Sequence, residues 1–296
     1  MIRTLSLSLS RFAVAAPLAL LATACGGGGA EGRGPESATT AAHASAPTRV
    51  SATPAPEGTD AKLKWALAGE QRSADNRARD VYRHPYETLS FFGLKDDMTV
   101  VELYPGGGWY TEVLAPVLRD RGKLVVSNFE SAFGKRFDAK LAASPAIYDK
   151  VDVRMINPPK SVPLGPDGSA DLVLTFRNVH NWMQDGDTES MFAAAFRVLK
   201  PGGTFGVVEH RAPAGASDEQ MKKTGYVSEE KVLAFAKAAG FVLEQKSEIN
   251  ANPKDTKDHP NGVWSLPPAL RGGEVDKAKF LAIGESDRMT LKLKKP

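Results

Sequence analysis

The pattern of hydrophobic and polar positions from residue 63 onward predicts strands that alternate with helices. Short runs of aliphatic and β-branched residues predict buried strands. We expect these strands at Met98–Leu103, Leu124–Ser127, Val151–Met155, Asp171–Phe176, Thr204–His210, 241–247 and 288–294. Amphipathic segments between them predict helices at 109–120, 131–143, 189–199 and 228–240. This alternation predicts an α/β protein with a doubly wound parallel sheet, which binds ligands at the carboxyl ends of its strands.

Two further helices are predicted ahead of the first strand. Ser73 is a suitable N-cap for a charged helix. That helix should stop near His84, because a proline disfavours helical backbone in the residue before it. Pro85 then begins a second short helix, which ends at Gly93.

The start of the chain has the layout of a secretory signal. It carries arginines and no acidic residue, and the apolar run from Phe12 to Ala24 is too short for a stable membrane-spanning helix. The small residues that precede Cys25 resemble the lipobox of bacterial lipoproteins, in which the cysteine is lipidated and becomes the first residue. We therefore predict a signal peptide at 1–24 and a lipid on Cys25. Cleavage near Ala24 without lipidation is the alternative.

Composition divides the rest of the chain into a tether and a folded domain. Residues 25–60 are rich in Gly, Ala, Ser, Thr and Pro and contain few large apolar residues, so they cannot bury enough surface to form a core. Residues 61–296 form the predicted domain. Cys25 is the only cysteine, which excludes an intramolecular disulfide. The formal charge of +3 falls to about +1 without the two arginines of the signal, so no nucleic-acid partner is expected.

A glycine-rich loop follows the first predicted strand. The segment VELYPGGGWY places Glu102 near the strand end and three glycines, Gly106 to Gly108, before the next helix. Glycines let the backbone approach a ligand closely, and free N–H groups at a helix start attract negative groups. By itself the loop is compatible with a dinucleotide site, a methyl-donor site or a tight turn.

The loop resembles motif I of the class I S-adenosylmethionine-dependent methyltransferases. The LKPGG turn at 199–203 and the AGF turn at 239–241 resemble turns of the same superfamily. RDVYRHPYETLSFFG, TFRNVHNW and EINANPKDTKDHP also resemble an exported bacterial branch described only as predicted methyltransferases. The resemblance implies a Rossmann-like fold with a seven-stranded sheet, an antiparallel last strand between the fifth and sixth, and an N-terminal helical cap. It also implies S-adenosylmethionine as the cofactor.

The resemblance implies a set of cofactor-binding residues at the ends of the first four strands. They are Glu102, Tyr104, Gly106, Gly107, Gly108, Asn128, Asn157, Arg177 and Asn178. Three of these depart from the superfamily pattern: Tyr104 replaces the first glycine, and Asn128 and Asn157 replace acids that face the ribose and the adenine. An asparagine in place of a carboxylate loses the charge-assisted part of a hydrogen bond, on the order of 1 kcal/mol. Glu130, two residues beyond Asn128, is a substitute.

Candidate catalytic residues follow the fourth and fifth strands. A histidine with a carboxylate in reach is a suitable general base, so we predict His180, Glu209 and His210 as the catalytic group. Asp255 and His259 in the loop that follows residue 248 add possible metal ligands, but no ligand spacing on a helix supports them and no metal is predicted. We expect that loop to be a lid or substrate loop. By the resemblance, Tyr82, His84 and Tyr86 of the N-terminal helices are expected to face the acceptor.

Together these features predict an exported lipoprotein that transfers the methyl group of S-adenosylmethionine to a small-molecule acceptor. Its expected location is the periplasmic face of a bacterial membrane, with the outer membrane favoured over the inner, and the anchor is the lipid on Cys25. The first alternative is a ligand-binding module that has lost catalysis. The second is a nicotinamide-dependent oxidoreductase, which is disfavoured because the full G-x-G-x-x-G pattern and the ribose acid are missing.

Overall fold

The structure is a computed structural model that describes residues 54–296. The predicted signal peptide, Cys25 and most of the predicted tether lie outside the described residues. The first helix, α1 (Thr59–Ala68), begins within the last residues of the predicted tether. No helix among the described residues has the length and apolar character needed to cross a membrane.

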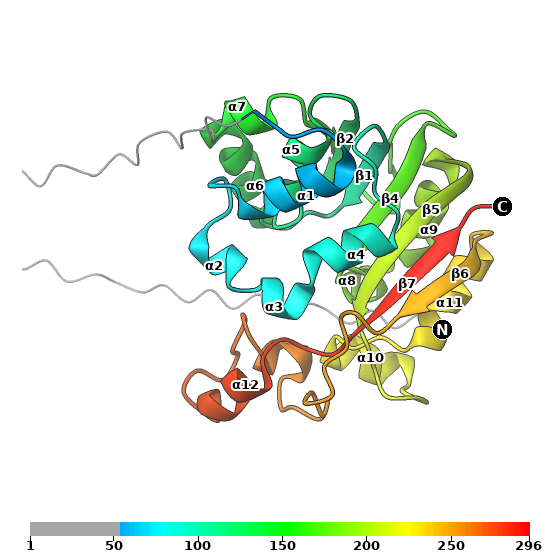
Figure 1. The fold of residues 1–296 in the computed structure, drawn as a ribbon. Helices are drawn as coiled ribbons and strands as arrows, with labels where there is room; N and C mark the ends of the chain where they lie inside the picture. Colours follow the sequence, from blue (N-terminus) through cyan, green and yellow to red (C-terminus); the bar gives the residue numbers. More distant parts are fainter. Residues whose placement is uncertain (1–53) are drawn as a thin grey trace, which may run out of the picture. The chain divides into compact units, whose positions relative to one another are not determined.

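The centre of the domain is one seven-stranded sheet (Figure 1) with the strand order β3-β2-β1-β4-β5-β7-β6. Strand β7 is antiparallel to both of its neighbours, β5 and β6, and the other strand pairs are parallel. This arrangement confirms the predicted sheet, including the antiparallel last strand between the fifth and the sixth. The strands are β1 (Thr99–Leu103), β2 (Lys123–Asn128), β3 (Asp152–Met155), β4 (Ala170–Phe176), β5 (Leu199–His210), β6 (Val242–Ser247) and β7 (Arg288–Lys294).

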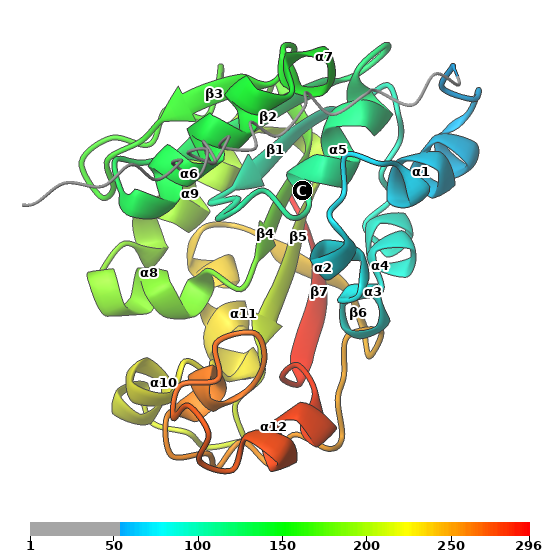
Figure 2. The same cartoon turned by 90° about the vertical axis from the view of Figure 1, so that its left-hand side faces the viewer.

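Helices cover both faces of the sheet. One hydrophobic core joins a face of the sheet to α8 (Val179–Asp185), α9 (Thr188–Val198), α10 (Asp218–Thr224) and α11 (Glu229–Ala238). A second core joins the other face to α1, α4 (Pro85–Phe91), α5 (Thr111–Leu118), α6 (Ala132–Ala143) and α7 (Pro145–Tyr148). Figure 2 shows α10 and α12 (Lys277–Ile283) beyond the carboxyl ends of β4 and β5.

The predicted charged helix after Ser73 is divided into two short helices, α2 (Ala74–Arg77) and α3 (Asp80–Arg83). Ser73 caps α2 as expected, and α3 ends at His84 in a left-handed conformation. The helix breaks because the carbonyl of Asn76 accepts bonds from the amide of Arg79 and from Trp109 Nε1, so it does not continue the i to i+4 pattern. The break places Arg79 and Arg83 over the ends of the strands.

Candidate active site

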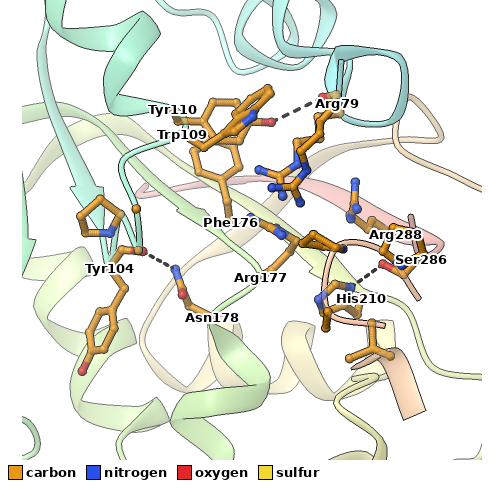
Figure 3. Close-up of a pocket in the computed structure, with 18 of the residues that line it drawn as sticks. Arg79, Tyr104, Trp109, Tyr110, Phe176, Arg177, Asn178, His210, Ser286 and Arg288 are labelled. Carbon is orange, nitrogen blue, oxygen red and sulfur yellow. Dashed lines mark hydrogen bonds between the residues drawn. The ribbon is translucent and has the colours of Figure 1, made fainter. Parts of the chain in front are cut away.

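A cavity of about 360 Å³ lies at the carboxyl ends of β1, β4 and β5. Its walls come from the glycine loop after β1, the ends of β4 and β5, the N-terminal helices and the segment 263–269. This is the position at which a doubly wound sheet binds its ligand. Figure 3 shows side chains from these separate segments converging on one space.

The glycine loop presents bare backbone to the cavity. No atom lies within 4 Å of the place where a Cβ would stand on Gly106 or Gly107, and both glycines line the cavity. A Cβ on Gly108 would instead meet the ring of Phe137 on α6 at 3.0 Å. The first two glycines therefore leave space for a ligand, whereas the third lets the loop pack against α6.

Glu102 is buried beside the glycine loop and lines the cavity. Thr111 Oγ1 at the start of α5 donates a hydrogen bond of 2.6 Å to its carboxylate. Burial raises the pKa of Glu102 to about 7, and the bond from Thr111 opposes this shift. Near neutral pH the carboxyl group therefore exchanges readily between its neutral and charged forms, and a cationic ligand would favour the charged one.

Two non-glycine residues adopt left-handed backbone where β1 and β4 end. Tyr104 has a φ of 50° and Arg177 a φ of 62°, conformations that cost about 1–3 kcal/mol each. The side chain of Asn178 ties the two strand ends together, because its Nδ2 donates to the carbonyls of Leu103 (3.0 Å) and Tyr104 (3.3 Å). Asn178 thus links the loop after β4 to the loop after β1 by hydrogen bonds.

The phenol ring of Tyr104 does not fill the cavity. Figure 3 shows it directed away from the arginines. The ring packs against Phe129 and Trp182, with centroid separations of 4.4 and 5.7 Å. Tyr104 replaces the expected glycine without closing the space above the loop.

The other two departures from the superfamily pattern lie away from the cavity walls. Asn128 is buried and turned toward α6, where its Nδ2 donates to Gly134 O and to Asp138 Oδ1. Asn157 is exposed on the turn after β3. Neither residue lines the cavity, so the expectation that their side chains face a nucleoside finds no geometric support. Glu130 is exposed on the loop after β2, where it also lies outside the cavity lining.

His180 and Glu209 form a buried pair at the ends of β4 and β5. His180 Nδ1 lies 2.9 Å from Glu209 Oε1. The carboxylate also accepts the backbone N–H groups of Val179 (2.6 Å) and His210 (2.8 Å), which hold it in place. A carboxylate that accepts the Nδ1 proton leaves Nε2 of the ring as the basic nitrogen, and His180 lines the cavity. This is the geometry of an oriented general base.

His210 lines the same cavity but has a different environment. Its Nδ1 lies 2.5 Å from Ser286 Oγ, and its ring centroid is 5.2 Å from that of His180. Burial lowers the pKa of His210 well below its usual value, and the neighbouring His180 and three arginines act in the same direction. His210 is therefore held neutral at physiological pH.

His180, Glu209 and His210 also form a cluster in which one potential metal-ligand atom from each lies within 4.8 Å of the others. Both oxygens of Glu209 accept hydrogen bonds, and one of these bonds is to the ring of His180. The positive charges near His210 further oppose a cation. The absence of a metal at this cluster stays a prediction. Asp255 and His259 lie outside the cavity lining and bond to each other at 2.8 Å.

The N-terminal helices face the cavity, but with residues other than those expected. The cavity is lined by Asn76, Arg79 and Arg83 rather than by Tyr82, His84 and Tyr86. The predicted lid contributes an apolar wall through Val263, Trp264, Leu266, Pro267, Pro268 and Ala269. Ser286 and Arg288, at the start of β7, also line the cavity, and sequence reasoning had missed them. The sequence around these two residues gave little indication of a site, because a short polar stretch before a strand is typical of any surface loop.

The comparisons with known proteins agree with this geometry. Residues 102–207 match a family model described as "Methyltransferase domain". This segment of the chain is similar to the methyltransferase domain that the family model describes. The matched segment runs from Glu102 into β5, so it includes the glycine loop and the end of β4 that is followed by Arg177 and His180.

Solved structures share the fold of this chain at low sequence identity. One is a SAM-dependent methyltransferase from Aquifex aeolicus, with a TM-score of 0.52, 17% identity, and coverage of 80% of this chain and 98% of that chain. Another is geranyl diphosphate C-methyltransferase from Streptomyces coelicolor, with a TM-score of 0.51, 15% identity and coverage of 78% and 87%. A third is the [4+2]-cyclase SpnF, with a TM-score of 0.55, 18% identity and coverage of 77% and 86%. No curated protein matches the sequence.

Proposed function

We propose that this chain uses S-adenosylmethionine to methylate a small-molecule acceptor in the cavity described above. The observation that carries the proposal is the bare backbone of Gly106 and Gly107 beside His180 and its carboxylate partner. The loop and His180 line the same cavity, so one bound ligand can contact both. Methyl transfer requires mainly that two reactants be aligned and that a proton be removed where the acceptor has one.

The residues at the glycine loop fit the methionyl part of the cofactor. Space above Gly106 and Gly107 admits a chain close to the backbone, and Glu102 supplies an acid for a cationic amino group. Glu130 is the residue that we expect to accept hydrogen bonds from ribose hydroxyls, because Asn128 is committed to α6. Phe133, exposed at the start of α6, lines the cavity on this side.

In the proposed reaction, bound S-adenosylmethionine supplies an electrophilic methyl group. Nε2 of His180 takes the proton from the acceptor, and Glu209 stabilises the imidazolium that results. Trp264, whose ring meets that of His180 at a centroid distance of 6.0 Å, limits the access of water to the base. His210, being neutral, hydrogen-bonds without adding a further positive charge.

Substitution of Gly106 by aspartate is expected to abolish binding of S-adenosylmethionine and S-adenosylhomocysteine. The carboxylate would enter the open space above the loop. Titration calorimetry of the full chain with both nucleosides measures this, and we expect a loss of at least about 100-fold in affinity, or about 2.7 kcal/mol.

Gly168→Asp is a matched control for that experiment. Gly168 has a φ of 66°, close to the 58° of Gly106, and no atom near its Cβ position, but it lies away from the cavity. The backbone strain is therefore similar in the two variants and only the location differs. Unchanged binding by Gly106→Asp, or failure of the wild type to bind either nucleoside, would refute the proposed function. Failure of the wild type to bind either nucleoside would favour the alternative of a ligand-binding module without catalysis. The observation that favours this alternative is the side chain of Asn128, which bonds to α6 instead of facing a nucleoside.

We also propose that the enzyme is exported and attached to the periplasmic face of the membrane by a lipid on Cys25. The supporting observation is the small-residue sequence before the sole cysteine, at the end of an apolar run. Labelled palmitate fed to cells that express the full chain should enter the wild type and not Cys25→Ser. Equal labelling of the two proteins would contradict lipidation at this position.

A further inference from the structure

The cavity of this protein is lined by four arginines that come from three distant parts of the chain. Arg79 and Arg83 belong to the N-terminal helices, Arg177 follows β4 and Arg288 begins β7. Figure 3 shows Arg79, Arg177 and Arg288 around the same space. Glu102 is the only acidic residue in the lining, and its raised pKa leaves it partly neutral. The cavity therefore carries a large excess of positive charge.

A single carboxylate behind the lining is shared by three of these arginines. Glu285 lies 2.5 Å from Arg79 Nε and 3.2 Å from Arg83 Nε, and it also bonds to Arg288 Nη2. Its pKa is held far below the usual value by these guanidinium groups, against the effect of burial. One negative charge cannot neutralise three positive ones, so about two positive charges remain uncompensated.

Arg177 adds a fourth charge with no carboxylate partner among the residues that the structure describes. Burial lowers the pKa of Arg177 to about 10, and the charge of Arg288 nearby acts in the same direction. Burial and like charge destabilise the charged form of a guanidinium and so lower its pKa. A bound anion therefore stabilises that charged form. Arg177 lies in left-handed backbone at the end of β4, and its side chain lines the cavity.

Several hydrogen-bond donors of the cluster are buried and unused. Arg79 Nη2, Arg83 Nη1 and Arg288 Nε have no partner within the described part of the chain. Arg83 and Arg288 are each only 2% exposed. Arg83 also stacks on the ring of Trp109 at 4.6 Å, which fixes the direction of its guanidinium plane. Buried donors without acceptors are costly, and a bound oxyanion would satisfy them.

The arginines exceed what the methionyl carboxylate of the cofactor requires. A carboxylate has two oxygens, and one arginine binds both in a bidentate pair. The same cavity is also lined by the apolar residues of segment 263–269, and Trp264 lies next to His180. A ligand that matches both walls has an anionic group at one end and an apolar or aromatic body at the other.

We propose that the acceptor is an apolar or aromatic molecule with a carboxylate or phosphate group, which Arg83, Arg177 and Arg288 bind. The apolar body then lies against Trp264, next to His180. That this molecule is a methyl acceptor rests on the proposed function. That the cavity binds an anion rests on the arginine cluster alone.

The test uses the full chain and three small probes: phenyl phosphate, benzoate and benzyl alcohol. Titration calorimetry with each probe is carried out with and without saturating S-adenosylhomocysteine. We expect at least one of the two anions to bind about tenfold or more tightly than the neutral alcohol, because charge-assisted hydrogen bonds to arginine are lost with the alcohol. The tighter of the two anions identifies the head group.

Arg177→Gln is the diagnostic variant, because Arg177 forms no salt bridge that supports the fold within residues 54–296. It should weaken binding of the anionic probes about tenfold and leave the alcohol unchanged. Arg197→Gln, on the exposed face of α9, is the matched control and should bind all three probes as the wild type does. Thermal unfolding of both variants verifies that they are folded.

Three results would overturn the proposal. They are equal affinity for anions and alcohol, unchanged anion affinity in Arg177→Gln, and complete displacement of the anions by S-adenosylhomocysteine. The last result would assign the arginines to the cofactor itself. Anion binding that persists while S-adenosylhomocysteine fails to bind would refute the proposed function and support the anion site, so the two failures are distinguishable.

Discussion

Replacement of Glu285 by glutamine is expected to lower the free energy of unfolding by about 3–5 kcal/mol at neutral pH. Glu285 is 2% exposed and is the shared partner of three arginines. The variant leaves those guanidinium groups buried without a counter-charge, which is the costly case for a buried ion pair. Urea unfolding followed by circular dichroism measures the difference.

The pH dependence of this effect has a defined sign. The pKa of Glu285 in the folded protein lies well below its ordinary value of 4.5, so the folded state keeps the carboxylate charged when the unfolded state takes up a proton. The stability that Glu285 contributes is therefore fully present above pH 4.5 and is lost as the pH falls below it. The difference between the wild type and Glu285→Gln should shrink in the same range.

Glu274→Gln is the control for the stability experiment. Glu274 lies in the same C-terminal segment and pairs with Lys277, but its side chain is 86% exposed. Its loss should change the free energy of unfolding by less than about 0.5 kcal/mol. A similar loss in both variants, or a Glu285→Gln difference that does not diminish at low pH, would contradict the account of the arginine cluster.

Replacement of His180 by alanine is expected to lower kcat by about 10²–10⁴-fold, the usual range for loss of a general base. Binding of S-adenosylhomocysteine should be retained, because the glycine loop is unaltered. The rate is measured with radiolabelled S-adenosylmethionine and the acceptor that the wild type methylates. Added imidazole should restore part of the rate, since the substitution leaves space beside Glu209.

Two further histidine variants sharpen the result. His84→Asn is the control, because asparagine tolerates the left-handed backbone of His84 and this residue does not line the cavity. It should retain full activity. His210→Asn should have a smaller effect than His180→Ala, because the side chain of His210 contacts Ser286 rather than a carboxylate. Equal rates for His180→Ala and the wild type would exclude His180 as the base.

The alternation of apolar strands and amphipathic helices was sufficient to predict the sheet. Most strand positions agreed because β-branched runs bounded by glycines and prolines carry the signal locally. The fifth strand was the exception, since β5 begins at Leu199 and includes the segment predicted as a turn before Thr204. The predicted length of the helix after Ser73 was wrong. The interaction that divides this helix is a hydrogen bond from Trp109, which lies more than thirty residues away along the chain. The helix α8 escaped prediction because its short run follows β4 directly and lacks a separate start signal.

The candidate site divides in the same way. The sequence was sufficient to predict the glycine loop and to bring His180, Glu209 and His210 to one edge of the sheet, because the carboxyl ends of neighbouring parallel strands must meet there. The structure then showed that Glu209 pairs with His180 rather than with His210. Only the tertiary structure decided that Asn128 turns toward α6 and that Arg79, Arg83 and Arg288 converge on Glu285. An arginine on a helix has the same local pattern whether it faces solvent or a cavity. Its partner here lies about two hundred residues away along the chain, and only the insertion of β7 beside β5 brings the two together.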